Sequence, residues 1–290
     1  MKSRKPIVSG QFYPAHKNSC IEEIQQMLEQ AKITRELPDY IDGGIVPHAG
    51  WTFSGRLAAM VFSAVKQKNQ KVDTFIIFGA AHGYFGSSPA VYDSGHWLSP
   101  LGEAAVDDEL AELIISTGQA VADTQAHSAE HSIEVQVPFV QHLFAGARIV
   151  PIVVPPTEQA VTLGSSIGQI ISREYKTIVC IGSTDLTHYG PRYGFTPMGT
   201  GKEALDWAGK VNDKRFIDLA LKLETQKMLT EAAENGNACG PGAAAATVAA
   251  VKELDKNEGI LLEHTDSNSV ITKRMGTPGS ESVGYAAIVF

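Results

Sequence analysis

Two histidines stand among small residues at the ends of apolar segments. His48 lies in the tetrapeptide PHAG after the segment GGIV, and His82 lies in GAAHG after the segment DTFIIFG. Small neighbours leave room for a ligand or a metal ion to approach an imidazole. Either segment alone also fits a tight turn that merely contains a histidine. Together they are better evidence for a shared site, because the ends of parallel strands converge in space.

Two further segments combine a histidine with a carboxylate. His131 and Glu134 are three residues apart in EHSIE, so a helix would place them on one face, as an acid–base group or as an ordinary ion pair. Asp185 and His188 lie in STDLTHYG after the apolar segment KTIVCIG. They could form an Asp–His pair, whereas Asp185 alone also fits a helix N-cap. The motif G-x-S-x-G is absent, which disfavours a serine hydrolase.

A thiol lies at the predicted start of an alanine-rich helix. Cys239 occurs in NACGPG, and a helix N-terminus favours the thiolate, which is both a nucleophile and a metal ligand. The alternative is a small buried residue, which fits Cys20 and Cys180 better. Two histidines and an anionic third ligand form an open metal site. A carboxylate as third ligand would indicate iron(II), and a thiolate would make copper(I) or zinc competitive.

The elements that must position these residues alternate along the chain. Apolar spacing predicts strands that end just before His48, His82 and Asp185. Near-continuous apolar strands between amphipathic helices favour an α/β fold with a mixed, largely parallel sheet flanked by helices. No linker marks a boundary, so a single domain over residues 1–290 is expected. The predicted strands are 43–47, 73–79, 148–154, 176–182, 259–264 and 283–290, and the predicted helices are 18–32, 54–68, 130–144, 202–223, 225–234 and 240–255.

Composition excludes several classes of protein. The 290 residues are 43% hydrophobic, which is enough to form a large core and excludes general disorder. The formal net charge of −8 argues against a nucleic-acid binder. No run of about 18 apolar residues is present, so a membrane span is not expected. The basic first residues lack the apolar segment of a secretory signal and cysteines are few, so we expect a cytoplasmic protein.

Seven segments in order resemble the Memo family, which is component B of the AmmeMemoRadiSam system in prokaryotes. The family is similar in fold to the class III extradiol (LigB-type) dioxygenases, which open catechol-like rings with iron(II). The resemblance therefore implies one α/β domain with a metal pocket at an edge of the sheet. The matching segments are GQFYPA (10–15), PHAGWTFSG (47–55), GAAHG (79–83), EHSIEVQVPF (130–139), STDLTHYG (183–190), NACGPGA (237–243) and SVGYAAIVF (282–290).

The resemblance also assigns expected roles to individual residues. It implies that His48, His82 and Cys239 bind one metal ion, with iron(II) or copper expected and zinc as a further alternative. The expected catalytic residues are His188, Asp185 and His131, and the expected substrate contacts are Trp51 and Glu134. The ring-cleaving dioxygenases have a carboxylate where this chain has Cys239, which disfavours ordinary iron(II) ring cleavage.

Two functions stay open at this point. The first is a metal-dependent redox enzyme with a dioxygenase-like pocket, acting on an unidentified small molecule that could be aromatic. The second is a non-catalytic module that binds a metal or a peptide in the same pocket. Other components of the AmmeMemoRadiSam system are expected partners in either case.

Overall fold

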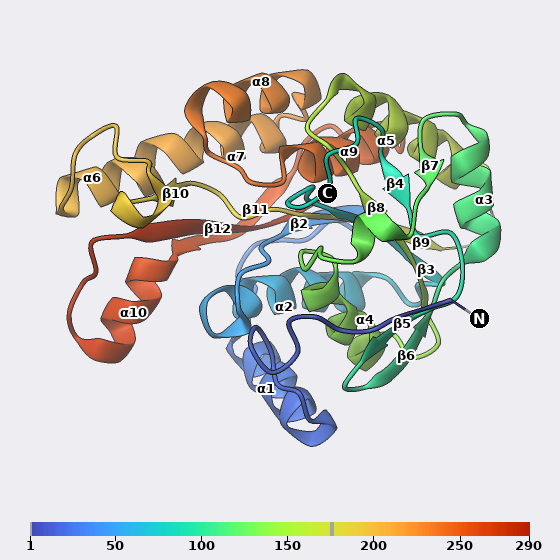
Figure 1. Ribbon diagram of the computed structural model, residues 1–290, viewed down its shortest axis with the longest axis horizontal. Coiled ribbons are helices and arrows are strands. Elements are labelled where there is room, and N and C mark those ends of the chain that lie inside the picture. Colours follow the sequence, from blue (N-terminus) through green and yellow to red (C-terminus); the bar gives the residue numbers. More distant parts are fainter. Residues whose placement is uncertain (1, 175–176) are drawn as a thin grey trace.

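A mixed sheet of nine strands forms the centre of the computed structural model, which describes residues 2–174 and 177–290 (Figure 1). Four parallel strands form its middle, and antiparallel pairs flank them on both sides. In order across the sheet, the strands are β10 (His188–Tyr189), β12 (Ser282–Val289), β2 (Gly43–Val46), β9 (Ile178–Ser183), β3 (Thr74–Gly79), β8 (Arg148–Val153), β4 (Ala90–Val91) and β7 (Val121–Ala122), and β11 (Ile260–Asp266) pairs with β12.

The parallel strands are buried on both faces, as their apolar sequences require. Every residue of β2, β3 and β9 is buried. Val46 of β2 is paired with Ser183 of β9, and Phe78 of β3 is paired with Gly182 of the same strand. The carboxyl ends of these three strands therefore lie at one edge of the sheet. The loops that follow them carry His48, His82 and Asp185.

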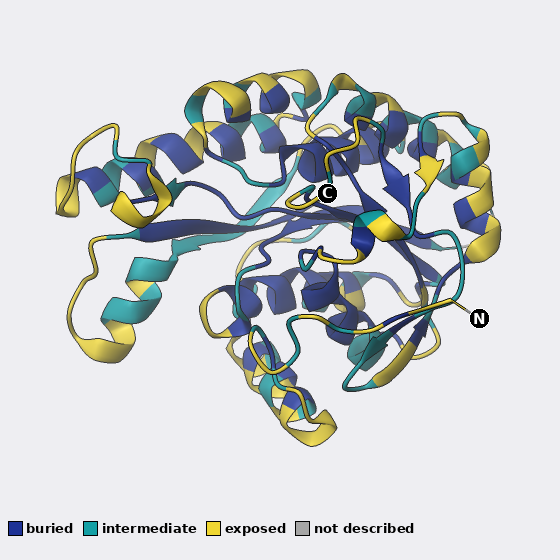
Figure 2. Cartoon of the chain, in the orientation of Figure 1, coloured by how far each residue is buried: buried dark blue, intermediate teal, exposed yellow. Residues whose placement is uncertain are grey.

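Helices cover both faces of the sheet (Figure 1). On one face lie α1 (Lys17–Gln30), α2 (Trp51–Lys68) and α4 (Val137–Leu143), and on the other lie α5 (Glu158–Ile171), α7 (Lys214–Leu221), α8 (Thr225–Asn235) and α9 (Pro241–Lys252). The central strands of the sheet and α9 are buried, whereas the outer helices expose one side (Figure 2). Among the described residues, no helix is long and apolar enough to cross a membrane. The remaining helices are α3 (Asp108–Ser116), α6 (Lys202–Trp207), α10 (Ser267–Met275) and a π-helical turn (Ala208–Asp213) between α6 and α7.

The α/β class with a mixed sheet flanked by helices is confirmed, and each predicted strand lies within two residues of an observed one. Lys176, the first residue of the predicted strand 176–182, lies outside the described residues. The predicted helix 130–144 is wrong in its first half. Residues 130–133 form a turn, a 3₁₀ turn covers Glu134–Gln136, and α4 begins at Val137 with a proline in its first turn. The predicted helix 202–223 is divided by the π-helical turn.

A buried arginine attaches the N-terminal strand to the loop that contains His131. Arg4 lies in β1 (Ser3–Arg4), which forms a small second sheet with β5 (His96–Ser99) and β6 (Gly102–Ala105). Its Nη1 donates to Glu134 Oε2 at 2.7 Å, and both side chains are at most 5% exposed. Its Nε donates to the carbonyl oxygen of His127 and its Nη2 to that of Glu130. These bonds hold residues 127–134 against the start of the chain.

Replacement of Arg4 by Met should lower the free energy of unfolding by about 3–5 kcal/mol, because it leaves the Glu134 carboxylate buried without its cation. The double variant Arg4→Met/Glu134→Gln should recover part of this loss. Lys2→Met is the matched control, because the Lys2–Asp93 pair is largely exposed and should contribute about 1 kcal/mol or less. Denaturant unfolding curves measure all three. Equal losses in Arg4→Met and Lys2→Met would contradict a stabilising role for the buried Arg4–Glu134 pair.

A buried histidine in the same region makes stability depend on pH. Burial lowers the pKa of His127 to about 4, and its ring lies edge-on to those of Tyr92 and Trp97. The unfolded chain therefore takes up a proton at this residue near pH 6.5, whereas the folded chain does so only near pH 4. Stability is lost as pH falls through this window, by on the order of 3 kcal/mol. In His127→Phe the loss of stability between pH 6.5 and 4 should be smaller, as measured by urea unfolding at each pH. The same pH dependence in both proteins would refute this role.

Candidate metal site

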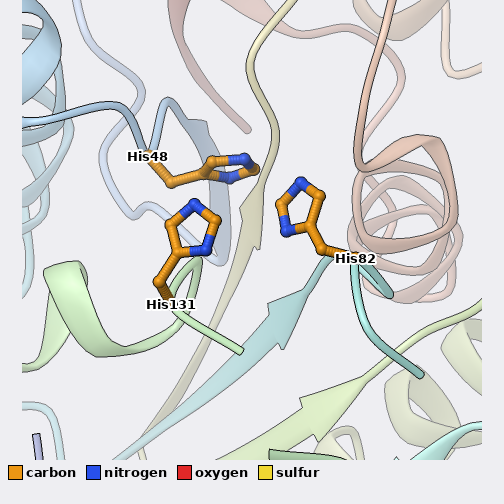
Figure 3. A group of neighbouring side chains, drawn as sticks. All are labelled: His48, His82 and His131. Carbon is orange, nitrogen blue, oxygen red and sulfur yellow. The ribbon is translucent and has the colours of Figure 1, made fainter. Parts of the chain in front are cut away.

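Three histidines from three loops meet beyond the edge of the sheet (Figure 3). His48 follows β2, His82 follows β3, and His131 lies in the turn before Glu134–Gln136. One ring nitrogen of each lies within 4.8 Å of the other two. His48 is buried, His131 is half-buried and His82 is exposed, so the group extends from the interior to the surface. Residues that are 34 and 49 positions apart along the chain thus form one cluster that can hold a metal ion.

Hydrogen bonds determine which nitrogen of His48 carries the proton. Its Nδ1 lies 3.1 Å from Ser183 Oγ, and that hydroxyl donates its own proton to the carbonyl oxygen of Ser132 at 2.8 Å. Ser183 Oγ therefore accepts a hydrogen bond from the N–H at Nδ1 of His48, which leaves the lone pair of the ring on Nε2. Burial, and then the neighbouring histidines, lower the pKa of His48 well below its ordinary value. A neutral imidazole with a free Nε2 is the form that binds metals.

A carboxylate orients His82 in the same way. Glu130 Oε1 lies 3.1 Å from His82 Nδ1, and Oε2 accepts from the backbone N–H of His82 at 3.0 Å. Burial alone would lower the pKa of His82, but the hydrogen bond and charge of Glu130 outweigh burial and raise it. Burial would raise the pKa of Glu130, but His82 and Ser132 hold it well below its usual range. A carboxylate behind a histidine is a common arrangement at metal sites, where it orients the metal-binding nitrogen.

Glu130 is the site residue that sequence reasoning missed. The expected helix 130–144 placed Glu134 beside His131, whereas the observed turn directs Glu130 towards the histidines and Glu134 towards Arg4. The signal in the sequence was a second carboxylate directly before His131 in EHSIE. His131 Nδ1 lies 3.9 Å from Glu130 Oε1, too far for a hydrogen bond. His131 instead stacks on His82, with ring centroids 4.8 Å apart, and burial lowers its pKa.

Cys239 lies against the deepest histidine. Its Sγ is 3.1 Å from His48 Nε2, the nitrogen that carries the lone pair, so the thiol donates to it. Two hydrogen bonds with Asp185 hold Cys239 in place. The backbone N–H of Cys239 donates to the carbonyl oxygen of Asp185, and the backbone N–H of Asp185 donates to the sulfur of Cys239. Burial raises the pKa of the thiol, and α9 begins two residues later. Of the three residues predicted as metal ligands, His48 and His82 thus lie in the cluster, whose third member is His131, and Cys239 contacts His48. The role of Cys239 as a metal ligand stays a prediction.

Asp185 and His188 have separate partners in place of the expected Asp–His pair. Asp185 Oδ1 accepts from the backbone N–H groups of His48 at 2.7 Å and Ala49 at 3.3 Å, and burial raises its pKa to about 7. It therefore holds the backbone of the His48 loop. His188 Nδ1 donates to the carbonyl of Leu186 at 3.0 Å, which leaves Nε2 as an acceptor. Burial lowers the pKa of His188. Its predicted role as an acid–base group stays a prediction.

Trp51 and Glu134 are both buried in contacts of their own. Trp51 is 3% exposed, its Nε1 donates to the carbonyl of Val135, and its ring packs on Tyr13 and Phe139. Glu134 accepts from the Tyr13 hydroxyl in addition to Arg4. These contacts are structural, and substrate binding by the two residues stays a prediction without support from them.

The aromatic ring observed at the histidine cluster is Phe12, whose centroid lies 5.0 Å from that of His131. A groove of about 1350 Å³ lies elsewhere, between α1, α2, β11 and α10. Trp51 and Arg56 are among its lining residues, and none of the three clustered histidines is. The groove is therefore separate from the histidine site.

Comparisons with known proteins identify a family that this chain matches over almost its whole length. A family model described as Memo-like protein matches residues 4–289. A MEMO1 family protein of Thermococcus onnurineus is 38% identical over 300 residues, which cover 99% of each chain, and one of Methanosarcina acetivorans is 34% identical over 100% of this chain and 99% of the relative. The crystal structure of the uncharacterized protein JW3007 from Escherichia coli K12 is similar in fold, with a TM-score of 0.52 and 11% sequence identity. The matched region covers 84% of this chain and 99% of the JW3007 chain, and at this identity it shows a shared fold alone. By its match over almost the whole chain, the protein belongs to the Memo family.

Proposed function

We propose that the protein binds one redox-active metal ion at the cluster of His48, His82, His131 and Cys239 and acts as a non-haem redox protein on a small molecule. Iron(II) or copper is the proposed metal, with zinc as the alternative. The observation that supports this most directly is the convergence of three imidazoles from three loops.

The chemistry of the donors fits a metal. Ser183 and Glu130 each accept from Nδ1 of a histidine, so both His48 and His82 present Nε2. Imidazole nitrogen suits iron, copper and zinc, and a thiolate favours copper(I) and zinc. As a ligand, Cys239 would bias the site towards the softer metals, and its contact with His48 Nε2 supports this role.

Several residues beside the cluster are suited to act on a bound molecule. A redox metal here would supply electron transfer to or from the substrate. His188 Nε2 is free to accept a proton, and the His188 ring packs edge-on against Tyr193 at 5.2 Å. Phe12 presents an apolar edge beside His131. Asp185 keeps the loop of His48 in position through its two backbone bonds.

A non-catalytic function is the second candidate. The observation that favours it is Cys239, which stands where the ring-cleaving dioxygenases have a carboxylate. Under this alternative the same donors would hold a soft metal ion tightly, or bind a peptide, and pass it to a partner protein. A partnership with other components of the AmmeMemoRadiSam system stays a prediction under both functions.

Metal analysis by mass spectrometry after anaerobic purification tests metal binding. The wild-type protein should contain about one equivalent of iron, copper or zinc, and His48→Ala and His82→Ala should contain little. Glu130→Gln should weaken affinity about 10- to 100-fold, because His82 loses the negative charge and one of the two acceptor oxygens that orient it. His142→Ala, in the last turn of α4, is the control and should retain the metal. Full metal content in folded His48→Ala and His82→Ala would refute the proposed site.

Turnover separates the two candidate functions. The metal-loaded protein is supplied with oxygen and a panel of aromatic diols, and oxygen uptake is followed beside His188→Ala. Steady uptake that falls in His188→Ala supports the redox enzyme and excludes the purely binding role. Stoichiometric metal without uptake for any compound favours the binding module.

A further inference from the structure

The π-helical turn Ala208–Asp213 contacts two loops beside the proposed metal site, the one that carries His188 and the one that carries Cys239. A π-helical turn is uncommon and often occurs at functional sites. Here it interrupts an otherwise regular helical segment, and its last two residues, Asn212 and Asp213, are at most 1% exposed. Two adjacent buried polar side chains on a helix require partners, and these partners come from the loops that carry His188 and Cys239.

Asn212 bonds to both loops at once. Its Nδ2 donates to Thr187 Oγ1 at 3.1 Å and to the carbonyl of Asn235 at 3.0 Å. Its backbone carbonyl oxygen accepts from Asn237 Nδ2 at 2.9 Å, a bond that does not involve the Asn212 side chain. Thr187 is adjacent to His188, and Asn237 is two residues before Cys239. One residue therefore connects the loop of the proposed acid–base histidine with the loop of the thiol.

Asp213 adds a second hydrogen bond to the loop that carries His188. Its Oδ1 accepts from the backbone N–H of Thr187 at 2.9 Å, and its Oδ2 lies 2.9 Å from His264 Nε2. Gly284 of β12 makes room for this carboxylate, because a Cβ at position 284 would lie 2.0 Å from Oδ2. The π-helical turn is thus attached to the sheet as well as to the two loops.

We infer that Asn212 is a positioning residue, which sets the place of Cys239 relative to His188 and His48. Its side chain holds Thr187 and Asn235, and its backbone carbonyl holds Asn237. The hydrogen bonds described above carry the positioning role itself. Its effect on metal binding rests on the proposed metal site. It predicts that loss of the Asn212 side chain loosens the Cys239 loop even in metal-free protein. It also predicts weaker metal binding, in the range of about 10- to 100-fold that is typical when a partner behind a metal ligand is removed.

The first readout is the rate at which Cys239 of the metal-free protein reacts with a disulfide reagent such as DTNB. Cys20 and Cys180 are buried, whereas Cys239 is partly exposed, so the folded protein reports on Cys239. Asn212→Ala and the isosteric Thr187→Val should both react several-fold faster than wild type. Both variants lose the Asn212–Thr187 hydrogen bond, and Asn212→Ala also loses the bond to Asn235, so the double variant should react little faster than Asn212→Ala alone. Ile217→Val, in the core side of α7, is the control for a general loss of stability and should react at the wild-type rate.

The second readout is the dissociation constant for Co(II), together with the near-ultraviolet absorption band of a thiolate–Co(II) bond. Asn212→Ala should bind Co(II) more weakly and lose intensity in this band. An unchanged thiol rate in Asn212→Ala and Thr187→Val overturns the positioning role, whatever the metal data show. A raised thiol rate in a protein whose wild type binds no Co(II) supports the positioning role and counts against the proposed metal site.

Discussion

The hydroxyl of Ser183 joins the three parts of the chain on which the histidine site depends. It donates to the carbonyl of Ser132 and accepts from His48 Nδ1 and Gln136 Nε2. Ser183 is the last residue of β9, paired with Val46 of β2, so its position follows from the parallel register of the sheet. One side chain at a strand end thereby fixes the proton of His48 and the distance of the His131 turn from the sheet. Ser183 thus connects the loop of His48 with the turn that carries His131.

The site combines a neutral interior with a charged rim. His48 is deeply buried and neutral, with the thiol of Cys239 on its free nitrogen, whereas Glu130 brings a negative charge to the more exposed His82. An incoming cation would therefore meet the carboxylate-backed imidazole of His82 before the buried imidazole of His48. This gradient suits a site that must accept an ion from solution and then hold it, and it is compatible with both proposed functions.

Strands and their terminal histidines could be predicted from the sequence because their signals are local. Apolar segments such as TFIIFG identify a buried strand, and a histidine among glycines directly after it identifies a loop at the sheet edge. Glu130 could not be assigned, because the helical spacing of 130–144 continues through a turn whose shape is determined by distant partners, among them Arg4. The π-helical turn at Asn212 also has no local signal, since its spacing resembles an ordinary helix. Both failures concern residues whose position depends on contacts between remote segments.

The order of the donors along the chain has a consequence for biosynthesis. His48, His82 and His131 are translated long before Cys239, and β2 lies between β9 and β12, the C-terminal strand. Because both of its neighbours in the sheet are made later, β2 and the His48 loop that follows it can be paired only when most of the chain has been synthesised. The place of His48 beside Cys239 is therefore reached late in synthesis, after the segments that carry His82 and His131 have been made.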